Sequence, residues 1–419
     1  MQSEKFFTKI LKLVLVLIGL VLLIDFWPRP IRSIWVRYPQ LDQLRLATKF
    51  TDPFYFPTQL KRSSLPHYQL NIKPNDLDKI NSSLPQPYTF TIYSRLQQVD
   101  APGTFIGDDD KSYLVKARVH GDLYHHWSGA KKSWRIKFDD NTLDGYKEIT
   151  LLLPETRDFL IESLVRFRAE KLGLIALDSW FVTLSINGED QGIYFVQEHW
   201  TKDLLEKNQR MTDGDLFGEL DLENVWDWPE LFVQLEAWKK YTQNPVAQKD
   251  FSSIKVLLEL FQSDPTSIFD NAQRIIDVGS FARWQAHSML FPSFHQDNGH
   301  NMRIFFNRDS GLFEFIPFDL EPSLPQENFD DRDYNQLVTL MLQVPEIKSM
   351  RDQILIDYVS DDKNLADDLK FYDALFRKVR SSFAADSQKA YSTLFFVRNV
   401  AEHRANLIKQ FSNIKKEVL

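Results

Sequence analysis

Acidic and amide side chains gather in one stretch of the chain, from His295 to Ser323. Asp297 and Asn301 precede an alternating apolar run over residues 302–306, and a turn and a second apolar run then lead to Asp319. This pattern predicts a β-hairpin with oxygen-bearing side chains at its ends. Carboxylate and amide oxygens held by a rigid pair of strands suit a divalent cation that carries phosphate. An ordinary solvated hairpin with common turn residues is the alternative interpretation.

A basic strand is the second candidate for chemistry. It is predicted from Lys131 to Phe138 and follows a turn-rich loop over residues 121–129. The period of two in a strand puts Lys132 on the same face as Trp134 and Ile136. A lysine on the buried side of a strand behind a glycine-containing loop can hold nucleotide phosphates. A solvated surface strand rich in lysine is the alternative.

Composition excludes several other classes of protein. The net charge of −8 over 419 residues argues against a non-specific nucleic-acid binder, which needs clustered Lys and Arg. The absence of cysteine excludes disulfides, thiolate metal sites and cysteine nucleophiles. His120, His125 and His126 lie close together but match no metal-ligand spacing. The motifs of serine hydrolases, zinc proteases, Walker-loop proteins and Rossmann dehydrogenases do not occur either.

The first 30 residues predict a membrane anchor. Three lysines precede residues 13–24, which carry no charge, and Trp27 suits an interfacial position. We therefore expect a single-pass membrane protein with an uncleaved N-terminal transmembrane helix, and its catalytic domain outside the cytoplasm. A cleaved signal peptide is the alternative, and arginines after the apolar run leave the orientation open. Residues 31–66 are expected to form a juxtamembrane linker.

The remainder of the chain predicts an α+β fold in two parts. Residues 67–204 contain mostly strand patterns and the hairpin turn signal Asn187-Gly188. Residues 205–419 contain mostly helical patterns, including one predicted over 231–241, and enclose the hairpin at 295–323. The order of Lys132 before Asp297, Asn301 and Asp319 is the order in which kinase-like phosphoryl transfer uses these residue types.

Three motifs resemble those of the spore-coat CotH kinase family, which consists of atypical kinase-fold proteins. They are Lys131-Lys-Ser-Trp-Arg-Ile-Lys-Phe138, Ile186-Asn-Gly-Glu-Asp-Gln-Gly-Ile-Tyr194 with Glu198, and the run Asp297 to Phe306 followed by Ile316-Pro-Phe-Asp319. The resemblance spans roughly residues 67–323. The sequence departs from the family at His120-Gly-Asp122, where Arg-Gly-Asn is common, and at Glu321, where Asp is common. The family implies an atypical protein-kinase-like, two-lobed fold with a β-rich N-lobe and a mostly helical C-lobe.

The resemblance also implies roles for particular residues. Asp297 would be the catalytic carboxylate that faces the acceptor, and Asn301 with Asp319 would hold Mg²⁺. The cofactor-binding residues would be Lys132, Arg135, Glu198 and Arg303. The glutamate that partners Lys132 is left open between Glu170 and Glu162.

The expected function is that of a membrane-anchored kinase that uses ATP and Mg²⁺ to phosphorylate a protein acceptor. A kinase-fold enzyme that transfers AMP or ligates an amino acid is an alternative with the same residues. A pseudokinase scaffold is a third hypothesis, in which the acidic segment 211–230 and the helical tail bind a partner at the membrane. The sequence predicts neither the acceptor nor the oligomeric state.

Overall fold

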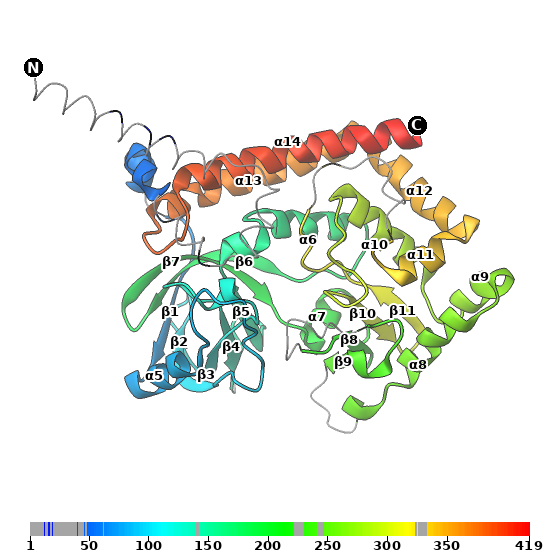
Figure 1. The fold of residues 1–419 in the computed structure, drawn as a ribbon, viewed down its shortest axis with the longest axis horizontal. Helices are drawn as coiled ribbons and strands as arrows, with labels where there is room; N and C mark the ends of the chain where they lie inside the picture. Colours follow the sequence, from blue (N-terminus) through cyan, green and yellow to red (C-terminus); the bar gives the residue numbers. More distant parts are fainter. Residues whose placement is uncertain are drawn as a thin grey trace, which may run out of the picture.

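The computed structural model describes residues 48–419 except 62, 140–141, 222–229, 242–246, 323–324 and 326–332, together with isolated positions before residue 48. Seven strands close into a barrel in the order β1-β2-β3-β4-β5-β7-β6 (Figure 1). The strands are β1 (His67–Ile72), β2 (Ala101–Ile106), β3 (Ser112–Val119), β4 (Trp134–Phe138), β5 (Glu148–Leu152), β6 (Ser179–Ile186) and β7 (Glu189–Glu198). All neighbours are antiparallel except β1 and β6, whose parallel pairing closes the barrel.

Alternation of apolar residues explains why the barrel closes. Apolar side chains from β1 to β7 point inward and form one buried cluster, which includes Leu70, Ile136 and Val196. The alternate residues of the same strands point outward. The turn predicted at Asn187-Gly188 is confirmed: both residues have positive φ, 51° and 82°, as a tight hairpin between β6 and β7 requires.

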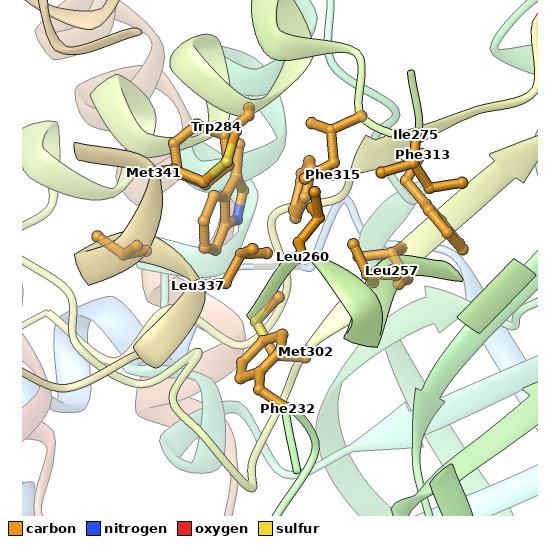
Figure 2. Close-up of a cluster of buried hydrophobic side chains, with 14 of the residues drawn as sticks. Phe232, Leu257, Leu260, Ile275, Trp284, Met302, Phe313, Phe315, Leu337 and Met341 are labelled. Atoms are coloured by element: carbon orange, nitrogen blue, oxygen red, sulfur yellow. The ribbon is translucent and has the colours of Figure 1, made fainter. Parts of the chain in front are cut away.

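A second sheet of four antiparallel strands lies beside the barrel, in the order β11-β10-β8-β9. Its strands are β8 (Asp215–Glu219), β9 (Trp238–Tyr241), β10 (Arg303–Asn307) and β11 (Leu312–Phe315). Buried residues of this sheet pack with those of the surrounding helices, including Trp284, Met302, Phe315 and Met341 (Figure 2). The hairpin predicted from the alternating runs is confirmed, since β10 and β11 pair antiparallel. The helix predicted over 231–241 is wrong, because Trp238–Tyr241 is a strand that pairs with β8.

Helices cover both sheets. The longest two, α13 (Asp362–Ala385) and α14 (Thr393–Val418), pack side by side above the barrel and the second sheet (Figure 1). The others are α4 (Phe56–Gln59), α5 (Pro74–Ser83), α6 (Ile161–Lys171), α7 (Lys202–Lys207), α8 (Ser252–Glu259), α9 (Ile268–Ala272), α10 (Val278–Leu290), α11 (Gln336–Leu342) and α12 (Pro345–Ser360). Side-chain caps fix several starts: Asp277 caps α10, Asn335 caps α11 and Ser392 caps α14.

The architecture corrects the fold expected from the sequence. The expectation was a two-lobed, protein-kinase-like fold preceded by a transmembrane helix. The structure instead consists of a closed seven-stranded barrel, a second four-stranded sheet and helices. The part after residue 205 is not simply helical, because β8, β9, β10 and β11 all belong to it.

The expected placement in a membrane is also corrected. No helix in the described part of the chain is long and apolar enough to cross a membrane. The predicted anchor over residues 1–30 lies outside the described residues except at three isolated positions. The structure therefore does not support a single-pass membrane protein.

Candidate functional site

A cavity of about 720 Å³ is lined by residues of the barrel, the second sheet, α14 and the loops that join them. The barrel contributes Arg118, Arg135, Thr150 and Gln197, and the second sheet and its flanking segments contribute Tyr241, Asn301, Arg303 and Asp319. Parts of the chain that are far apart in sequence thus meet here.

The barrel wall of the cavity is one row of residues across four strands. Arg118 of β3 is paired in register with Arg135 of β4, which is paired with Thr150 of β5 and, beyond it, Gln197 of β7. Their neighbours along each strand, such as Ile136, fill the barrel interior. Because side chains alternate along a strand, the same strands build the core with one face and the cavity wall with the other.

Two arginines stand side by side on this wall. Arg118 bonds to Gln98 and lies 3.4 Å from Asp100, while Arg135 bonds to Glu148 and donates to Nε2 of His199 at 2.7 Å. Burial and neighbouring positive charge lower the pKa of Arg118 to about 10 and that of Arg135 to about 9. Guanidinium groups whose charge is disfavoured by burial and by other nearby arginines create a site that an anion would stabilise.

The opposite wall presents Asn301 and Asp319. Both residues have left-handed backbones, with φ of 58° and 49°. Their positions are tied together by His295, whose Nδ1 lies 2.7 Å from the Asp319 carbonyl oxygen and 3.1 Å from the Asn301 amide nitrogen. A backbone conformation that costs free energy at two neighbouring polar residues is typical of a functional site.

Asp319 also contacts Arg157, in the segment between β5 and α6, and Glu162, in the first turn of α6. Its Oδ1 accepts a hydrogen bond from Nη1 of Arg157 at 2.8 Å, and its backbone N–H donates to Oε1 of Glu162 at 3.3 Å. Burial alone would raise the pKa of Asp319, but Arg157 and the nearby histidines hold it below its usual value. Burial raises the pKa of Glu162 to about 7. The two carboxylates, within one small cluster, are therefore shifted in opposite directions in pKa.

Two of the predicted site residues do not line the cavity. Lys132 precedes β4, which begins at Trp134, and its carbonyl accepts a hydrogen bond from Tyr194 at 2.9 Å. Lys131 is the more buried lysine, with 5% exposure, and pairs with Asp386 at 2.6 Å. Asp297 closes the loop before Asn301, where its carboxylate accepts from the Gly299 N–H at 2.9 Å.

The other predicted residues do line it, with different partners. Arg135, Asn301 and Asp319 all line the same cavity. Glu198 directs its carboxylate to the Asp178 N–H at 2.7 Å and to Lys207 at 2.8 Å.

Arg303 is held in place by its surroundings. It makes two bonds to Glu219, and its guanidinium lies 4.6 Å from the ring centre of Phe318 and 5.3 Å from that of Trp200. These partners fix Arg303 as part of the wall.

Sequence reasoning missed two residues of the site, Arg118 and Arg157. Arg118 reaches it through strand pairing, which no local pattern reveals. Arg157 lies in a short 3-10 turn that no local pattern in the sequence links to Asp319. Of the two glutamates left open, Glu162 lies in the cavity, whereas Glu170 is half exposed and pairs with Arg166. The available signal for Glu162 was its position as the second residue of α6, beside the turn.

The residues at Asp319 fit a metal bound through phosphate. In the described residues, no group of three or more His, Asp or Glu side chains is gathered as a metal cage. Mg²⁺ does not need one, because it is usually held by one or two protein ligands together with phosphate oxygens. The Asp319 carboxylate and the Asn301 amide supply two such oxygens on the wall that faces the arginines.

The cavity thus brings two arginines of the barrel together with a carboxylate and an amide from the segments that flank the second sheet. The chain belongs to the CotH kinase protein family, whose profile matches residues 117–397. This membership confirms the resemblance seen in the sequence and supports a kinase-like function.

Individual proteins agree to different degrees. Inner spore coat protein H of Bacillus subtilis (strain 168) is 23% identical over 288 residues, which cover 65% of this chain and 72% of that protein. The crystal structure of the Helicobacter pylori proinflammatory kinase CtkA aligns over 68% of this chain and 94% of that one, with 11% identity and a TM-score of 0.28.

Proposed function

We propose that this protein is a phosphotransferase that uses Mg-ATP to phosphorylate a protein acceptor. The observation that carries the proposal is the meeting of Arg118 and Arg135 with Asn301 and Asp319 in one cavity. Membership of the CotH kinase protein family supports the same reaction class.

In this proposal the two walls divide the work. Arg118 and Arg135 bind phosphate oxygens, and an anion offsets the burial and the neighbouring positive charge that lower the pKa of both arginines. Asn301 and Asp319 hold Mg²⁺, which when bound neutralises charge on the phosphate oxygens. Their left-handed backbones, locked by His295, keep both oxygens in place before the ligand arrives.

A carboxylate must also take the proton of the acceptor hydroxyl. The proton leaves as the acceptor oxygen bonds to the γ-phosphorus and the bond from that phosphorus to the ADP oxygen breaks. The family resemblance gives this role to Asp297, whose pKa is raised by burial but whose side chain lies outside the cavity lining. Glu162 is the alternative, since it lines the cavity and its pKa is raised to about 7.

Isotope transfer tests the reaction. The purified protein is incubated with Mg²⁺ and ATP labelled at the γ- or the α-phosphate, and incorporation is measured into itself and into casein. We expect label only from the γ-position, and loss of incorporation in Asp319→Asn. Asp373→Asn is the matched control. Asp373 lies on α13, outside the cavity lining, and its half-exposed carboxylate pairs with Arg404. Label from the α-position, or equal incorporation in all three proteins, would overturn the proposal.

A further inference from the structure

Arg157 is the cation in direct contact with the carboxylate of Asp319. Its side chain is 9% exposed, and its Nη1 lies 2.8 Å from Oδ1 of Asp319 and 3.1 Å from the Thr156 carbonyl. Its Nε is buried and has no hydrogen-bond partner among the described residues. A buried donor left without a partner costs free energy, so this guanidinium is incompletely satisfied where it lies.

The backbone on both sides holds this contact in place. Arg157 ends a short 3-10 turn and is followed by Asp158 and Phe159, which both have positive φ, 46° and 60°. Asp319 is fixed by the contacts of its backbone with Glu162 and His295. The backbones of both residues are therefore held, which keeps the two side chains within reach of each other.

We propose that Arg157 is a built-in counter-ion that occupies the metal-binding carboxylate of the empty protein and moves to phosphate oxygens when a metal–nucleotide complex enters. This inference rests on the proposed function and deepens it. A guanidinium and Mg²⁺ cannot both approach Oδ1 of Asp319 closely, so a free metal ion must displace Arg157 and leave it buried without a counter-ion. A metal–nucleotide complex brings phosphate oxygens for Arg157, including its unpartnered Nε.

The consequence is an order of binding. The empty protein should bind a free divalent cation weakly and the metal–nucleotide complex well. Removal of the Arg157 charge should reverse the two preferences, because Asp319 becomes free for metal while the phosphates lose a partner. A residue with a purely structural role would weaken both kinds of binding or neither.

Mn²⁺ alone is the probe for the first half of the inference, measured by electron paramagnetic resonance of the free ion. We expect Arg157→Met to bind Mn²⁺ about tenfold or more tightly than wild type, because close buried charge pairs couple by at least that much. Asp319→Asn and the double variant should both lose this site. Arg404→Met is the matched control, since it breaks an ion pair of 2.9 Å outside the cavity.

Calorimetric titration with Mg²⁺ and a non-hydrolysable ATP analogue probes the second half. Arg157→Met should bind the complex more weakly than wild type, and Arg157→Lys, which keeps the charge, should lie between them. Thermal unfolding of each variant shows whether it is folded, and Arg157→Gln, which also removes the charge, replaces Arg157→Met if that variant is not folded. Unchanged Mn²⁺ affinity in a folded variant that lacks the charge would overturn the counter-ion role. Failure of wild type to bind the nucleotide complex would instead overturn the proposed function, and the Mn²⁺ result would still decide the role of Arg157.

Discussion

The two walls of the cavity are built in opposite ways. The barrel wall is regular: Arg118 and Arg135 are paired in register on neighbouring strands, and their positions follow from the ladder. The opposite wall is irregular, because Asn301 and Asp319 lie outside the strands of their hairpin in left-handed conformations. The regular wall supplies positive charge and the irregular wall supplies oxygen atoms. The comparison teaches that charge can be placed by a sheet, whereas ligands that must converge on one point require local strain held by neighbours.

Asp319→Asn, on the irregular wall, should have the largest effect on phosphate transfer. The amide keeps the shape of the side chain but loses the charge that would bind metal. We expect phosphate transfer to fall at least about 100-fold, as for the loss of a group that stabilises charge in a transition state. Initial rates of label transfer measure this. A loss smaller than about tenfold would mean that Asp319 does not hold the metal.

Arg135→Met, on the barrel wall, should have a smaller effect, which appears in anion binding. The loss of one of two phosphate-binding arginines should weaken binding of an anion without metal about 10-fold, since charge-assisted hydrogen bonds contribute about 1.5 to 3 kcal/mol. The rise in melting temperature with added pyrophosphate reports this affinity. Arg404→Met provides a control with the same substitution outside the cavity. If both variants respond like wild type, the barrel wall does not bind the anion.

Glu162→Gln should sharpen the difference between the two carboxylates near Asp319. A buried acid with a raised pKa keeps its proton in the folded protein at pH values where the unfolded chain has lost it. Glu162 therefore lowers stability as pH rises from its ordinary pKa of 4.5 to about 7. We expect Glu162→Gln to raise the free energy of unfolding by about 1 to 2 kcal/mol at pH 8 and much less at pH 5, because each pKa unit corresponds to about 1.4 kcal/mol.

Urea unfolding of the wild type and of Glu162→Gln at the two pH values gives this difference directly. Glu170→Gln is the matched control, since Glu170 lies on the same helix but is half exposed. An equal effect of Glu162→Gln at pH 5 and pH 8 would contradict the raised pKa.

Lys132→Met should have the smallest effect on nucleotide binding. The family resemblance implied that Lys132 binds the nucleotide phosphates, but Lys132 is not among the residues that line the cavity. We expect the variant to change the affinity for the ATP analogue by less than about threefold, well within the free energy of a surface substitution. A loss of affinity as large as that caused by Arg135→Met would mean that Lys132 does bind the nucleotide.

Local patterns predicted part of this structure well. The hairpin turn at Asn187-Gly188 and the strands β10 and β11 follow from turn residues and alternation over a few positions. The fold itself did not follow, because closure of the barrel depends on the pairing of β1 with β6, which are more than 100 residues apart. The prediction of a kinase-like two-lobed fold came from the resemblance of motifs, and motifs do not specify how strands pair.

The candidate site shows the same limit. Asn301 and Asp319 were predicted because they flank one hairpin, and the structure brings them together through His295. Lys132 was chosen by counting a strand period from Lys131, yet the strand begins at Trp134, so the alternation does not extend to it. Arg157 carries no local sequence signal, and only the tertiary fold reveals its contact with Asp319.

The binding of ATP with and without Mg²⁺ to wild type, Arg135→Met and Asp319→Asn tests the division between the two walls most directly. Calorimetric titration should show that Mg²⁺ strengthens ATP binding to wild type. Arg135→Met should weaken binding in both conditions and keep the benefit of Mg²⁺, whereas Asp319→Asn should bind metal-free ATP at least as well as wild type and gain nothing from Mg²⁺. If Mg²⁺ strengthens ATP binding to Asp319→Asn as much as to wild type, the irregular wall with Asn301 and Asp319 does not hold the metal, and the account is contradicted.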